Sequence, residues 1–121
     1  MRDLKKRTQR FALDCWHLCS GIPKSREYNA FVNQLIRSSS SVGANWRAAQ
    51  RGKSDKDFVN KLKIVEEEVD ESMYWLEMFM EILDGEQEQF KRLHTEGNEL
   101  LAITVASIKT AKKRINNESK G

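Results

Sequence analysis

Residues 55–83 read DKDFVNKLKIVEEEVDESMYWLEMFMEIL and carry the most regular apolar pattern in this chain of 121 residues. Apolar and small side chains recur there at alternating steps of three and four, which places them on one face of an α-helix. The members of this stripe are Phe58, Leu62, Val65, Val69, Ser72 or Met73, Leu76, Met80 and Leu83. The pattern predicts a long amphipathic helix that buries one face against other helices.

Three further stretches have helical spacing and are separated by residues that end helices. Gly21 and Pro23 end the first, because glycine suits the left-handed position after a helix and proline lacks the N–H that another turn needs. Gly52 ends the second, and Asp84 with Gly85 ends the third. The predicted helices cover residues 3–19, 26–51, 55–83 and 86–115, followed by a polar tail at 116–121 that we expect to fray.

The connections between these helices are short. Only three residues separate the second helix from the third, which favours antiparallel neighbours. We therefore predict an all-α fold in which residues 1–121 form a single domain, an elongated antiparallel up-down four-helix bundle.

The net charge of +3 hides three blocks of opposite sign. Residues 1–54 carry +8, residues 55–99 carry −9 and residues 100–121 carry +4. Such blocks attract one another, within or between subunits, before they attract an outside polyanion. The sequence has neither a run of eighteen apolar residues nor an apolar leader, so we expect a cytoplasmic protein without a membrane span.

A row of serines in the second predicted helix needs a packing reason, because serine is a poor helix former. Folding the chain back at the second turn places Arg37 opposite Asp70. We predict a buried ion pair between Arg37 and Asp70 or Glu71, with serine hydroxyls as supports. The full predicted polar seam is Arg37, Ser38, Ser41, Asn45, Glu67, Asp70 and Glu71. The alternative is that these acids form a solvated face.

Binding of RNA or DNA is an alternative function, based on basic residues near the chain start and the second turn. The candidates are Lys5, Lys6, Arg7, Arg10, Arg47, Arg51 and Lys53, and Lys112, Lys113 and Arg114 near the chain end could join them. A bundle brings them to one end if the first helix starts near the end of the second. The acidic block at residues 55–99 argues against strong attraction to a polyanion.

Residues for catalysis or metal binding lack the usual patterns. Di-metal bundles use two Glu-x-x-His motifs, whereas the nearest match here is Asp14-x-x-His17. Cys15, Cys19 and His17 lack a fourth zinc ligand, and we expect both cysteines to be reduced, semi-buried thiols. We therefore expect no enzymatic activity, no metal or other cofactor and no small-molecule substrate.

Two stretches of the chain resemble a known family. The first contains Arg37, Ser38, Ser41, Val42, Asn45 and Gly52, and the second is residues 66–77, EEEVDESMYWLE. Both resemble the 23S rRNA-intervening sequence protein family, whose members are four-helix bundles. The chain departs from the family pattern at Trp46 and Arg47, where many members have an aliphatic residue and soon afterwards an acid.

The resemblance implies a homopentamer arranged as a toroid. It also implies a likeness in fold to the accessory variability protein of diversity-generating retroelements, which binds nucleic acid and a reverse transcriptase. We therefore predict a non-enzymatic homo-oligomer, a pentamer by this resemblance, and keep nucleic-acid binding as the alternative.

Overall fold

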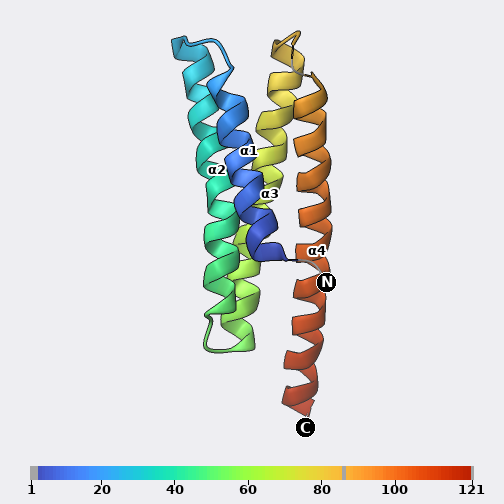
Figure 1. The fold of residues 1–121 in the computed structure, drawn as a ribbon. Helices are drawn as coiled ribbons and strands as arrows, with labels where there is room; N and C mark the ends of the chain where they lie inside the picture. The colour runs from blue at the N-terminus through green and yellow to red at the C-terminus, as the bar shows by residue number, and fades with distance from the viewer. Residues whose placement is uncertain (1–2, 86, 121) are drawn as a thin grey trace.

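The computed structural model describes residues 3–85 and 87–120, which form four α-helices in up-down order (Figure 1). The helices are α1 (Leu4–Ser20), α2 (Arg26–Gln50), α3 (Asp55–Ile82) and α4 (Gln87–Lys120). The predicted all-α four-helix bundle is confirmed. With 34 residues, α4 is about 50 Å long at the helical rise per residue, so the bundle is elongated.

Side chains cap the starts of α2 and α3. Ser25 accepts a hydrogen bond from the backbone N–H of Tyr28, and Ser54 accepts one from that of Asp57, each over 3.1 Å. The Asp57 carboxylate in turn accepts the backbone N–H of Lys53 over 3.3 Å. These bonds satisfy N–H groups that have no partner inside a helix, so each helix begins directly after its serine.

Two expectations about helix ends are wrong. Gly21 has a φ of −90°, which is not left-handed, so α1 ends because of Pro23 and not because of a left-handed glycine. The predicted end of the fourth helix at residue 115 is also wrong, since α4 continues to Lys120, and fraying of this end stays a prediction. Residues 116–119 contain no proline or glycine that would interrupt the helical hydrogen bonds. The predicted helix start at residue 86 lies outside the described residues.

Both α1 and α3 pack against α2 and α4. Within the described residues α3 adjoins α2 and α4, and α1 lies against the same two helices without adjoining α3. Figure 1 accordingly shows α1 in front of the bundle and α3 behind it. Because α1 is short, it starts about halfway along α4, and the C-terminal part of α4 continues past it (Figure 1).

The apolar stripes of the four helices meet in one core. Its largest fully buried members are Phe11, Leu35, Leu62, Leu76, Phe79, Phe90 and Leu93. Gly97 on α4 lies where side chains from α1 and α3 converge: an added Cβ would be 2.9 Å from Cγ of Met73 and 3.6 Å from Cε1 of Phe11. Phe11, Met73 and Gly97 therefore lie at one level of the bundle.

Candidate interaction surfaces

Arg37 on α2 joins two glutamates of α3. Its Nη1 donates to Oε2 of Glu68 over 2.9 Å, and its Nη2 donates to Oε2 of Glu71. The Glu71 oxygen also accepts the indole N–H of Trp75 over 3.1 Å. This cluster ties the middle of α2 to the middle of α3.

The cluster perturbs the pKa of two of its members. Burial raises the pKa of the Glu71 carboxyl, but the hydrogen bonds from Arg37 and Trp75 and the charge of Arg37 outweigh burial, so the pKa lies below its usual value. The hydrogen bonds to Glu71 and Glu68 raise the pKa of Arg37. Both groups therefore stay charged at neutral pH.

The predicted pairing of Arg37 with Glu71 is present, but the expectation that this pair is buried is wrong. The Arg37 side chain is 48% exposed, whereas Glu68 is 14% and Glu71 is 34% exposed. Asp70 and Glu67 also lie on the exposed side of α3. Residues of an α-helix are about 100° apart around the axis, so Glu68 and Glu71 share the side facing α2, and Asp70 does not.

The serine row supports helix packing and not the ion pair. Ser38 is fully buried, and its hydroxyl oxygen accepts a hydrogen bond from Ser72 of α3 over 2.9 Å. Asn45 donates over 2.9 Å to the backbone carbonyl of Ser41 on its own helix. Among the described residues, the predicted support of the ion pair by the Ser41 hydroxyl is not found. Ser72 was missed as a seam residue, although it stands in the apolar stripe of α3 and small polar residues in such stripes signal close helix approach.

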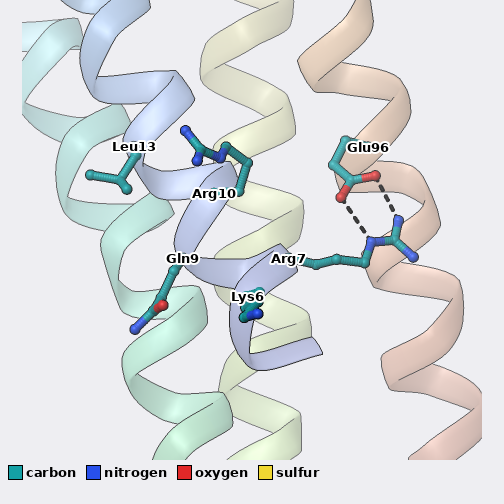
Figure 2. Close-up of a pocket in the computed structure, with 6 residues that line it drawn as sticks. All are labelled: Lys6, Arg7, Gln9, Arg10, Leu13 and Glu96. Atoms are coloured by element: carbon teal, nitrogen blue, oxygen red, sulfur yellow. Dashed lines mark hydrogen bonds and ion pairs between the residues drawn. The ribbon is translucent and has the colours of Figure 1, made fainter. Parts of the chain in front are cut away.

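Arg7 reaches across the bundle to α4. Its Nε donates to Oε2 of Glu96 over 3.0 Å and its Nη2 donates to Oε1 over 2.6 Å, a bidentate pair (Figure 2). Glu99 lies 3.5 Å from the same Nη2. These hydrogen bonds and charges raise the pKa of Arg7. Arg7 therefore fastens α1 to α4, which leaves it less available to an outside anion.

The other predicted basic residues do not gather at one end of the bundle. Lys5 and Arg47 border a groove between α1 and α2, and Lys6 and Arg10 border the next hollow on α1. Figure 2 shows Lys6 and Arg10 on the side of α1 that does not face Glu96. Arg51 and Lys53 are at the α2–α3 turn instead, beyond the start of α1, because α1 begins partway along the bundle.

Large apolar side chains lie exposed on two helices at opposite corners of the bundle. On α1, Leu13 is 50% and Trp16 is 54% exposed. On α3, Tyr74 is 51% and Ile64 is 37% exposed. Ile82, the last residue of α3, is 43% exposed.

The two cysteines and two histidines are the remaining residues that could carry chemistry. Cys15 and Cys19 are free and buried. In the described part of the chain, His, Cys, Asp and Glu side chains form no group of three suited to a metal ion. Over the same residues, no helix is both long and apolar enough to cross a membrane.

A comparison with known protein families identifies one that matches this chain. The model of the 23S rRNA-intervening sequence protein family matches residues 2–106. The chain belongs to this family. The resemblance seen in α2 and α3 therefore extends through α1 and most of α4.

A solved structure has the same fold. It is a protein with unknown function from the S23 ribosomal protein family of Bacteroides thetaiotaomicron VPI-5482, which is 30% identical to this family member with a TM-score of 0.80. The match covers 87% of this chain and 97% of that chain. No curated protein matches the chain.

Proposed function

We propose that this family member is a non-enzymatic interaction protein that assembles with copies of itself. The observation that carries the proposal is the exposure of Leu13 and Trp16 on α1. Burying an apolar side chain of this kind fully removes its area from water and stabilises an interface by up to about 1.5–3 kcal/mol. A second copy of the chain is a partner present wherever the protein is made.

The polar groups inside the bundle support a structural role for its core. Among the described residues, every buried side-chain nitrogen or oxygen has a hydrogen-bond partner. Thr8 and Thr104 bond to backbone carbonyls of their own helices, and Ser72 bonds to Ser38. We therefore propose that the core polar residues have a structural role and that the outer faces of the bundle carry the function.

Five copies are the stoichiometry that we propose, on the basis of the family resemblance. Sedimentation equilibrium, or light scattering on the protein as it elutes from a size-exclusion column, tests this stoichiometry. We expect a mass near five times the monomer mass of 14.1 kDa. A mass of 14.1 kDa at micromolar concentration would reject self-assembly, and another multiple would correct the stoichiometry alone.

Two substitutions on α1 test whether the exposed side chains of Leu13 and Trp16 form a subunit interface. Leu13→Ser with Trp16→Ser should shift the protein toward monomers without changing its helical circular dichroism, because both side chains are half exposed in the single chain. Ala102→Ser with Ala106→Ser is the control, since both residues are exposed on α4. An unchanged mass for the double variant would show that Leu13 and Trp16 are not part of the subunit interface.

Nucleic-acid binding is the second candidate function. It is favoured by Lys5 and Arg47, which face the same groove between α1 and α2, with Lys6 and Arg10 beside it. The likeness in fold to the accessory variability protein of retroelements, which we expect from the sequence resemblance alone, is consistent with this candidate. We propose that an assembled protein repeats this basic groove in each copy and so strengthens its attraction for phosphates.

Titration with labelled RNA and DNA at two salt concentrations tests the second candidate. Phosphate contacts make the logarithm of the binding constant fall linearly with the logarithm of salt concentration. Arg47→Ala should weaken binding and flatten this slope, whereas Lys113→Ala, on the exposed end of α4, should change neither. Absent or salt-insensitive binding would reject a nucleic-acid function.

A further inference from the structure

We propose that the outer face of α1 in one copy of the chain packs against the outer face of α3 in the next copy. The outer face of α1 consists of Lys6, Gln9, Arg10, Leu13 and Trp16, and that of α3 consists of Ile64, Glu67, Asp70, Tyr74 and Glu81. All ten residues are exposed in the single chain. The inference rests on the proposed self-assembly and names the surfaces that carry it.

The outer face of α1 combines positive charge with apolar area. Lys6 and Arg10 are 84% and 71% exposed, and their contacts with acids of their own helix are long, at 4.0 and 3.9 Å. Leu13 and Trp16 continue the same stripe toward the end of the helix. A matching partner must therefore present acids followed by an apolar side chain.

The outer face of α3 has the matching composition in the matching order. Glu67 and Asp70 precede Tyr74 by seven and four residues, and Lys6 and Arg10 precede Leu13 by seven and three residues. Neither Glu67 nor Asp70 has an ion-pair partner among residues 3–85 and 87–120. The two faces are thus complementary in charge and both carry exposed apolar side chains.

The two faces also lie at the same height in the bundle. Phe11 of α1 and Met73 of α3 converge on Gly97, and both helices run in the same direction (Figure 1). Each residue of α1 is therefore roughly level with the α3 residue about 62 positions later. This register puts Lys6, Arg10 and Leu13 within about one helical turn of the levels of Glu67, Asp70 and Tyr74.

Equal height decides what kind of assembly the two faces can build. Since α1 and α3 occupy opposite corners, a contact between them joins two different surfaces and repeats from copy to copy. Copies related by rotation about an axis parallel to the helices stay level, so level faces are one requirement for a closed ring of parallel bundles, and the angle between the two faces must also close the ring. Faces offset along the axis would instead build an open helical filament.

Charge reversal on each face tests this pairing by sedimentation in low salt. Lys6→Glu with Arg10→Glu should raise the dissociation constant about 100-fold, because it sets like charges against Glu67 and Asp70. Glu67→Lys with Asp70→Lys should do the same from the other side. All four substitutions together restore opposite charges at every contact and should return the wild-type mass. Lys112→Glu with Lys113→Glu is the control for an equal change of net charge on exposed residues of α4.

The outcomes separate this inference from the proposed function. Dissociation of both double variants, with recovery in the fourfold variant, supports the pairing of α1 with α3. A wild-type mass for both double variants would overturn the pairing and leave self-assembly standing, and loss of RNA binding in the Lys6 and Arg10 variant would then assign the α1 face to nucleic acid. A monomeric wild-type protein would overturn the proposed function itself.

Discussion

Ser72 of α3 donates a hydrogen bond to the hydroxyl oxygen of Ser38 on α2 over 2.9 Å, and both side chains are fully buried. Ser72 also lies 2.8 Å from the carbonyl of Glu68, and Ser38 lies 3.3 Å from that of Leu35. Ser38 can donate to its carbonyl while it accepts from Ser72, whereas Ser72 has one hydrogen, so the Glu68 carbonyl is its alternative acceptor. The small volume of the two serines is what lets α2 and α3 approach closely at this level.

Substitutions at Ser38 separate the effects of size and hydrogen bonding. Ser38→Ala should lower the free energy of unfolding by under about 1 kcal/mol, because Ser72 keeps the Glu68 carbonyl as an acceptor. Ser38→Leu should lower it by about 1–3 kcal/mol, because the larger side chain has no space. Urea unfolding measures both. Ser40→Leu, at an exposed position, should change stability by no more than about 0.5 kcal/mol. Equal effects of alanine and leucine at position 38 would refute the packing argument.

Removing Arg37 should have a small effect on stability. Since nearly half of this side chain is exposed, Arg37→Ala should lower the free energy of unfolding by under about 1 kcal/mol. Thermal unfolding measures the change, and Arg26→Ala, in a more exposed pair with Glu27, should produce an even smaller one. A loss above about 3 kcal/mol is the size expected for a buried pair and would contradict the exposed geometry.

The contribution of Arg37 should depend on pH. The pKa of Glu71 is lower in the folded protein than its ordinary value of 4.5, so this carboxylate stabilises the fold fully above pH 4.5. The stabilisation is lost as the pH falls through the folded pKa. Urea unfolding of wild type and Arg37→Ala between pH 7 and acid pH should therefore give a difference that shrinks below about pH 4.5. A difference that grew toward acid pH would contradict the sign of the shift.

The two cysteines should react slowly in the folded protein. Burial raises the pKa of Cys15 to about 12, helped by its neighbour Cys19, and burial raises the pKa of Cys19 to about 11. The thiols therefore stabilise the fold below their ordinary pKa of 9.0, and this contribution is lost as the pH rises toward 11–12.

Thiol modification at pH 8 measures that protection. A disulfide reagent should modify the native protein at least about 100-fold more slowly than the protein in urea, since only the thiolate attacks. A third cysteine introduced by Ser40→Cys should react quickly and supply the internal control, because Ser40 is exposed. Equal rates for all three thiols would contradict the burial of Cys15 and Cys19.

The predicted polar seam shows how precisely sequence spacing predicts which residues of α2 and α3 meet. Folding the chain back at the second turn places Arg37 opposite Asp70, and the arginine binds Glu68 and Glu71, one residue or two from that position. Sequence spacing predicts the level along a helix to within a turn. It does not predict which side of α3 faces α2, because that rotation depends on how the whole apolar stripe packs against all its neighbours.

The sequence by itself determined the four helices, their order and the antiparallel pairing of α2 with α3, because apolar spacing, serine caps and short turns act over a few residues. Only the tertiary structure decided where α1 lies. Arg7 meets Glu96, a residue 89 positions away, and Phe11 meets the α4 surface at Gly97. Such contacts depend on the shape of side chains brought together from distant parts of the chain, and this shape exists only once the other helices have packed.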